Sequence, residues 1–403
     1  HSHSHLRRHQ PATMAEEAAA PLLHGLPDEI VVWEILIRLD PKSLLRCRAV
    51  RRAWRCATSA RRFLLAHHAR QPTLPIVFGD RYRNILALDH RASADAQLHT
   101  IARLDEDFML EASCDGLLLL SKFDHIVGFR TYLSVCNPAT SQHASLRPLS
   151  GFDILGMYPH SPTGEYRLLL QRMNYMDSSE YQIGFYVFGL GSNEAPRYIG
   201  CSETKLALAF FNVPVRLRDS LHWYPLEYRT ESDHLEYEEE SKLVVTVFDT
   251  IAESFRQMRA PLVSTNSSIF KVDDMLGICN CNQALEIVDI WVLQDYQSEV
   301  WDLKYRIELR LDELTKLRGE LEGLDGDGNW SLTAASGDGD VLLLVSFSHW
   351  SFGHWLFYVD TDGELVASFQ DLYACKHRFK QTLVPHDLFT TLEGHAVGAS
   401  PLI

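Results

Sequence analysis

The chain has 403 residues, of which 46% are hydrophobic, and its formal net charge is -15. This length exceeds that of a typical single domain and predicts two domains, while the apolar content excludes a largely disordered chain. The negative charge argues against nonspecific nucleic-acid binding. No apolar run approaches the roughly 20 residues that cross a bilayer. We therefore expect neither a nucleic acid nor a membrane as a partner.

Residues 1–25 are expected to form a mobile leader. Residues 1–13, in which histidine occupies every second position up to His5 and two arginines follow, lack the apolar segment of a secretion signal. Met14, followed by Ala-Glu-Glu, is typical of a natural start, so residues 1–13 are expected to be upstream or added sequence. The eight cysteines are scattered, and without an export signal we expect reduced thiols in a cytoplasmic or nuclear protein.

Residues 26–70 have the pattern of three short helices. Pro27 and the two acidic residues after it suit a helix N-terminus, because proline fixes φ and negative charge is stabilised there. The segment that follows is apolar around most of its circumference. Asp40 precedes a proline and should end this helix. Asp40 or Ser43 can cap the second helix, and the third is expected to run through residues 53–63.

A helical module of about 45 residues buries too little surface to be comfortably stable alone. Its apolar first helix therefore predicts a second polypeptide that completes the core. The ordered pattern LPDEIVVWEILIRLDPKSLLRCRAVRRAWR at residues 26–55 resembles an F-box, with Asp40 where many plant members carry a second proline. The alternative is a generic helical hairpin with a basic last helix.

The F-box resemblance implies docking onto the Skp adaptor subunit of a cullin-based ubiquitin ligase. The arginines between residues 46 and 62 either face an acidic surface of that partner or form a solvated face. The residues that the resemblance assigns to Skp binding are Leu26, Pro27, Ile30, Ile35, Leu36, Leu39, Pro41, Leu44, Leu45, Val50 and Trp54.

Beyond a proline-containing linker at 71–75, short apolar or alternating runs are separated by Gly, Asp, Asn and Pro, which is typical of an all-β domain. The runs occur in pairs, and equivalent positions recur after 51, 54, 55 and 65 residues. These positions are Leu118, Leu169, Trp223, Ile278 and Leu343. Repeats of about this length, each supplying four short strands, predict a β-propeller.

One more pair of runs at 76–89 brings the count to about six blades. The expected fold is thus an α+β multidomain chain with a three-helix F-box at 26–70, an all-β propeller at 76–385 and a C-terminal tail at 386–403.

The propeller region also resembles the F-box-associated domain of plant F-box proteins, which is kelch-like in fold. The matching pieces are SCDGLL at 113–118, VCNPAT at 135–140, VFDT at 247–250 with ESF at 253–255, and DIWVL at 289–293 with Trp301. The Gly-Gly doublets of ordinary kelch repeats are missing. The resemblance implies a domain that holds a protein target.

Two segments interrupt the repeats. Residues 227–241 are rich in glutamate and predict a solvated loop, with an acidic contact for a basic substrate as the alternative. Residues 314–324 have leucines at helical spacing and predict a short amphipathic helix on the propeller flank.

We expect no catalytic residues, metal site or cofactor. Asp325 begins a calcium-like loop, but tryptophan and serine occupy the positions that need glycine and glutamate. Cys279 and Cys281 lack a second ligand pair at zinc spacing and suit core packing. His349 and His354 suit aromatic contacts better than a metal pair, and no nucleophile or phosphate-loop motif occurs.

The sequence therefore predicts a non-catalytic substrate adaptor of a Skp–cullin–F-box ligase, whose propeller holds an unidentified protein target. Two alternatives remain: an enzyme built on a propeller, and an interaction protein whose F-box serves assembly without ubiquitination.

Overall fold

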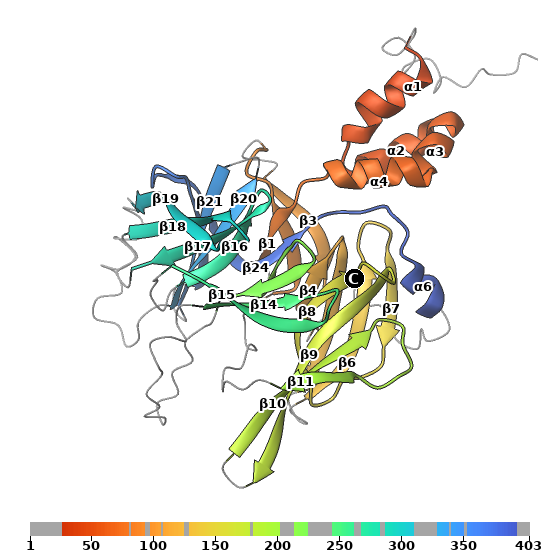
Figure 1. The fold of residues 1–403 in the computed structure, drawn as a ribbon. Coiled ribbons are helices and arrows are strands. Elements are labelled where there is room, and N and C mark those ends of the chain that lie inside the picture. The colour runs from red at the N-terminus through yellow and green to blue at the C-terminus, as the bar shows by residue number, and fades with distance from the viewer. Residues whose placement is uncertain are drawn as a thin grey trace, which may run out of the picture. The chain divides into compact units, whose positions relative to one another are not determined.

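The computed structural model describes residues 26–79, 82–92, 97–105, 108–124, 129–177, 180–201, 213–224, 244–261, 267–282, 287–309, 329–337, 340–349 and 353–392 (Figure 1). They form two compact units that divide between Gln71 and Pro72. No helix among these residues is long and apolar enough to span a membrane. The acidic segment 227–241, the segment 314–324 and the loop at Asp325 lie outside the described residues.

The first unit is helical. It comprises α1 (Asp28–Ile30), the π-helical turn η1 (Val31–Ile35), the 3-10 turn η2 (Leu36–Arg38), α2 (Pro41–Val50), α3 (Arg52–Ser59) and α4 (Arg61–Arg70). The backbone N–H of Ser43 donates to Asp40 Oδ1 at 3.0 Å, so Asp40 is the cap of α2. The buried core of this unit includes Val32, Ile37, Leu44 and Phe63.

The last predicted helix of this unit is in fact two helices, which makes the three-helix prediction too simple. Ala60 has φ -65° and ψ 135°, an extended conformation that separates α3 from α4. Arg51 separates α2 from α3 in the same way, with ψ 126°. Neither residue is glycine or proline, so the local sequence carries no strong break signal.

The second unit is a six-bladed β-propeller, as predicted. Its described strands form six antiparallel four-stranded sheets, one for each blade. Blade 1 contains β24 (Tyr373–Phe379), β1 (Leu74–Gly79), β2 (Asn84–Leu88) and β3 (Leu98–Arg103); blade 2 contains β4 (Phe108–Cys114), β5 (Leu117–Asp124), β6 (Phe129–Asn137) and β7 (Gln142–Leu146); blade 3 contains β8 (Asp153–His160), β9 (Glu165–Asp177), β10 (Glu180–Gly189) and β11 (Arg197–Cys201).

The other three blades follow the same plan. Blade 4 contains β12 (Val215–Leu217), β13 (Ser220–Trp223), β14 (Val244–Asp249) and β15 (Ser254–Arg259); blade 5 contains β16 (Ser267–Val272), β17 (Met275–Cys281), β18 (Ile287–Asp295) and β19 (Val300–Glu308); blade 6 contains β20 (Asn329–Gly337), β21 (Asp340–His349), β22 (Gly353–Val359) and β23 (Leu365–Gln370).

Blade 1 closes the ring, because its first strand comes from the C-terminal part of the chain and its other three from the N-terminal part. β24 pairs antiparallel with β1, with Phe379 opposite Leu74 and Tyr373 opposite Phe78. After β24, helix α6 (Asp387–Leu392) packs into the core of blades 2 and 3 through Leu388, Phe389 and Leu392.

The paired runs detected in the sequence are the second and third strands of each blade. All five equivalent positions are fully buried in the propeller core: Leu118, Leu169, Trp223, Ile278 and Leu343. The first strands of the blades lie innermost: β24 contacts β4 and β20, β4 contacts β8, and β16 contacts β12 and β20. These strands surround the central channel.

Candidate functional site

The structure divides the residues assigned to Skp binding into two sets. Six are exposed on the helical unit: Leu26, Pro27, Ile30, Ile35, Leu45 and Val50. Four are buried in the unit's own core, namely Leu36, Pro41, Leu44 and Trp54, and Leu39 is half-buried. The buried side chains hold the helices together, so only the exposed set is available for direct contact.

The helical unit has an unusually apolar surface. Of the fourteen large hydrophobic side chains that are exposed in the described residues, six belong to this unit. Val50 is the most exposed of them, at 68%. The sixth, Leu65 on α4, was not among the predicted docking residues. Exposed apolar surface concentrated on one small unit is typical of a protein–protein interface.

Polar contacts hold the helices that present these side chains. Asp28 accepts hydrogen bonds from Arg51 Nη1 at 2.7 Å and from Trp54 Nε1 at 3.3 Å, which tie the first helical segment to α3. Arg48 donates to the side chain and carbonyl of Thr58 at 2.9 and 2.6 Å. Arg48 therefore has a role within the unit, and is not simply part of a solvated basic face.

His67 joins α4 to the end of the first helical segment. Its Nε2 lies 2.7 Å from the carbonyl oxygen of Leu39, and Gln71 donates to the same oxygen at 3.0 Å. Burial lowers the pKa of His67. The ring is therefore neutral near pH 7 and donates one N–H to the Leu39 carbonyl.

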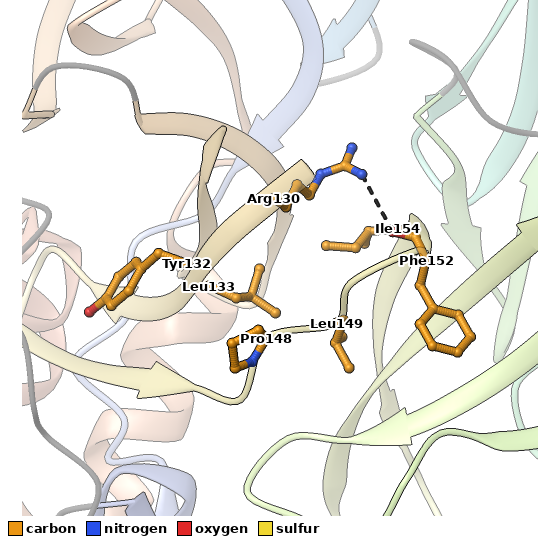
Figure 2. Close-up of a pocket in the computed structure, with 7 residues that line it drawn as sticks. All are labelled: Arg130, Tyr132, Leu133, Pro148, Leu149, Phe152 and Ile154. Atoms are coloured by element: carbon orange, nitrogen blue, oxygen red, sulfur yellow. Dashed lines mark hydrogen bonds between the residues drawn. The ribbon is translucent and has the colours of Figure 1, made fainter. Parts of the chain in front are cut away.

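A small pocket lies between blades 2 and 3 of the propeller. Figure 2 shows its lining, formed by Arg130, Tyr132, Leu133, Pro148, Leu149, Phe152 and Ile154. The pocket contains about 230 Å³ of space that is partly open to solvent.

Arg130 is the only charged side chain of this lining, and its charge is neutralised by two neighbours. Its Nε donates to Glu111 at 2.6 Å and its Nη1 to Asp153 at 3.3 Å. The same Nη1 reaches the carbonyl oxygen of Phe152 at 3.5 Å, drawn as the dashed line in Figure 2. The residues that line the pocket include no nucleophile with an adjacent base.

A second polar site joins the innermost strands of blades 2 and 4. Arg216 on β12 donates from both Nη atoms to the two carboxylate oxygens of Asp115, which follows β4, at 2.5 and 2.9 Å. Tyr166 on β9 donates to Asp115 at 3.3 Å. Sequence spacing could not reveal this site, because Asp115 and Arg216 come from blades that are not adjacent.

The other sequence candidates serve packing. Cys279 and Cys281 are buried in the core of blades 5 and 6, and burial raises the pKa of the Cys279 thiol. His354 makes edge contacts with Tyr82 and Tyr373, as expected for aromatic packing. Within the described residues, no group of three or more His, Cys, Asp or Glu side chains is placed to hold a metal.

A known protein family matches the propeller region, and one known protein aligns with most of the chain. A family model described as an F-box associated beta propeller domain matches residues 89–325. The F-box protein At5g10340 of Arabidopsis thaliana is 24% identical over 328 residues, which cover 70% of this chain and 69% of that protein. The F-box protein At2g34280 of the same plant is 34% identical over 146 residues, covering 32% of this chain and 35% of that protein.

The solved structures that resemble this chain have much lower sequence identity to it. A chain of the nidogen–laminin complex matches 76% of this chain and 99% of its own length, with 9% identity and a TM-score of 0.38. An oligogalacturonate lyase in complex with manganese matches 71% of this chain and 70% of its own length, with 11% identity and a TM-score of 0.36. Neither likeness supports an inference about activity.

Proposed function

Because this chain belongs to the F-box associated β-propeller family, together with F-box proteins of Arabidopsis thaliana, we propose that it is the substrate-recognition subunit of a Skp–cullin–F-box ubiquitin ligase. In this proposal residues 26–70 are the F-box and dock onto the Skp adaptor. The propeller holds the target protein. The chain forms and breaks no covalent bonds itself; a separate ubiquitin-conjugating enzyme acts on the target that it positions.

The observation that carries this proposal is the exposed apolar surface of the helical unit. Leu26, Ile30, Ile35, Leu45 and Val50 are between 39% and 68% exposed, and burying them against a partner would remove that apolar surface from water. Burial contributes roughly 25 cal/mol per Å² of apolar area. The buried residues of the assigned set, such as Leu44 and Trp54, would act indirectly by holding the docking helices in place.

The mechanism is proximity. An adaptor that binds the ligase at one end and a target at the other raises the effective concentration of target lysines near the conjugating enzyme. We place this activity in the cytoplasm or nucleus. The eight cysteines are free thiols, which suits a reducing compartment.

Co-purification of the intact chain tests the proposal. We expect the Skp adaptor and a cullin to be recovered with the wild-type chain and lost with a Leu45→Asp and Val50→Asp double variant. Both positions are exposed, so the substitutions should leave the core intact. Leu65→Asp is the matched control, because Leu65 is also exposed on the same unit but lies outside the assigned set, and it should retain both partners.

Recovery of the ligase subunits by the double variant would contradict the docking model. A chain that binds Skp but supports no ubiquitination of any captured target would instead favour the interaction protein that serves assembly alone.

A further inference from the structure

The innermost strand of blade 1 is interrupted by a two-residue bulge. Ala374 of β24 is paired with Val77 of β1, but Arg378 is paired with Pro75. Three residues of β24, Cys375, Lys376 and His377, therefore lie opposite the single residue Ile76. Proline has no N–H to donate, which explains why the ladder is broken beside Pro75.

This bulge lies beside the central channel. β24 is the first strand of its sheet, so β1 pairs with one of its edges, and no described strand pairs with the other. β24 also contacts β4 and β20, the innermost strands of the neighbouring blades. Bulges re-aim side chains and are over-represented near functional sites. In this strand the bulge contains Lys376 and His377 and is followed by Arg378, so a run of three consecutive basic residues lies on the innermost strand.

These basic side chains are half-buried without a balancing negative charge among the described residues. The guanidinium of Arg378 donates to two carbonyl oxygens, that of Ala334 on β20 at 2.5 Å and that of His377 at 3.3 Å. A guanidinium has five N–H donors, so three of them remain available. No ion pair joins Lys376, His377 or Arg378 to a carboxylate of the described chain.

The electrostatic consequence agrees with this geometry. Burial lowers the pKa of Lys376, lowers the pKa of His377 to about 4 and lowers the pKa of Arg378 to about 10. Partly desolvated cations of this kind are normally paired, because an unpaired buried charge is costly. An anion placed among them would remove this cost.

The ion pair of Arg216 and Asp115 joins the innermost strand of blade 4 to the turn after the innermost strand of blade 2. Burial lowers the pKa of Lys380, directly after β24, and the charges of Asp115, Lys271 and Arg216 also act on this lysine.

We propose that the bulge in β24 is a binding site for a compact, multiply charged anion with phosphate chemistry. Lys376 and Arg378 are its main ligands. Two neighbouring cations require at least two negative charges for balance, and a phosphate group offers several acceptor oxygens to the free guanidinium and ammonium donors. The site is independent of the proposed ubiquitin-ligase role and would stabilise the propeller by closing its centre.

Pyrophosphate binding to the purified full-length chain tests this proposal, with calorimetric titration and thermal unfolding at constant ionic strength. We expect saturable binding and a rise in Tm with pyrophosphate, as for any ligand specific to the folded state. The Lys376→Met variant should bind about tenfold more weakly or worse. The matched control is Lys304→Met, which removes an exposed lysine of β19 and should bind like the wild type.

The unliganded proteins provide a second readout. Lys376→Met should unfold at the same Tm as the wild type or higher, because it removes an unbalanced cation. Lys376→Arg keeps the charge and should keep the pyrophosphate response. Equal shifts in wild type and Lys376→Met, equal effects of sodium chloride and pyrophosphate, or a lower Tm of unliganded Lys376→Met would each overturn the proposal.

Discussion

Arg216 and Asp115 are 101 positions apart in the chain, yet the guanidinium of one binds both carboxylate oxygens of the other, at 2.5 and 2.9 Å. Arg216 lies on the innermost strand of blade 4, and Asp115 follows the innermost strand of blade 2. The pair therefore joins two blades that share no ladder of hydrogen bonds. Tyr166 of blade 3 donates to the same carboxylate, so three blades meet at Asp115.

Removing this arginine should destabilise the propeller. We expect Arg216→Met to lower the free energy of unfolding by about 1–3 kcal/mol, because it leaves a half-buried carboxylate without its charged partner. Arg216→Lys should restore only part of the lost stability, since lysine cannot make the bidentate contact with the carboxylate. Chemical denaturation of the full chain measures both values.

Arg306→Met is the matched control for this prediction. Arg306 binds both oxygens of Asp289 at 2.8 and 2.9 Å, but within one blade and with its side chain 64% exposed. Exposed pairs contribute roughly 0–1 kcal/mol. A loss in Arg306→Met as large as that in Arg216→Met would show that joining separate blades adds nothing.

Gly116, directly after Asp115, should tolerate no side chain. Its φ is +83°, and a Cβ there would lie 2.4 Å from Thr382 Cγ2 and 2.9 Å from the carbonyl oxygen of Lys380. We expect Gly116→Ala to cost about 2 kcal/mol or more, from backbone strain together with displacement of the segment after β24. Thermal and chemical unfolding give the measurement.

Gly151→Ala separates these two causes. Gly151 has a similar φ of +79°, with no atom within 4 Å of the added Cβ. It should cost only about 1 kcal/mol, the strain alone. If the two alanine variants were equally stable, the close approach of residues 380–382 to Gly116 would play no part in stability.

His222 should make the propeller sensitive to acid. The side chain is fully buried, and burial lowers its pKa to about 4. The carbonyl of Val215 can only accept, so Nδ1 donates to it at 3.1 Å and Nε2 accepts from the Tyr296 hydroxyl at 2.7 Å. The folded protein therefore favours the neutral ring.

The sign of the pH dependence follows from this pKa. An unfolded histidine titrates near pH 6.5, so the stability due to neutral His222 is complete above that pH. It falls as the pH drops from about 6.5 toward 4, by about 3 kcal/mol at most. Unfolding titrations between pH 4 and 7 should show a shallower slope for His222→Gln; an unchanged slope would mean that another group controls it.

The sequence predicted the blade centres because their strands are buried on both faces. Leu118 and Leu343 belong to continuous apolar runs and are fully buried, which makes such strands visible in a linear pattern. The innermost strands are different. β12 has three residues, and β24 carries Lys376, His377 and Arg378. β12 is too short, and β24 too interrupted by this basic run, to show an apolar periodicity.

The docking residues could be assigned only in part, because an apolar residue of a small helical unit can serve its own core or a partner. Leu44 and Leu45 are adjacent and chemically identical, yet Leu44 is fully buried and Leu45 is 39% exposed. Helical periodicity could not separate them, since both leucines belong to the same apolar run of the second helix. The break at Ala60 was equally invisible, because alanine is a strong helix former.

The most direct test of the adaptor role is the affinity of the purified full-length chain for a purified Skp adaptor. The account predicts a stable complex in isothermal titration. In Leu45→Asp with Val50→Asp, the affinity should fall by about 100-fold or more while Tm is unchanged, because two charges would enter an apolar interface. An unchanged affinity in this folded double variant, or no complex with the wild-type chain, would contradict the claim that the exposed apolar residues between Leu26 and Val50 bind the ligase.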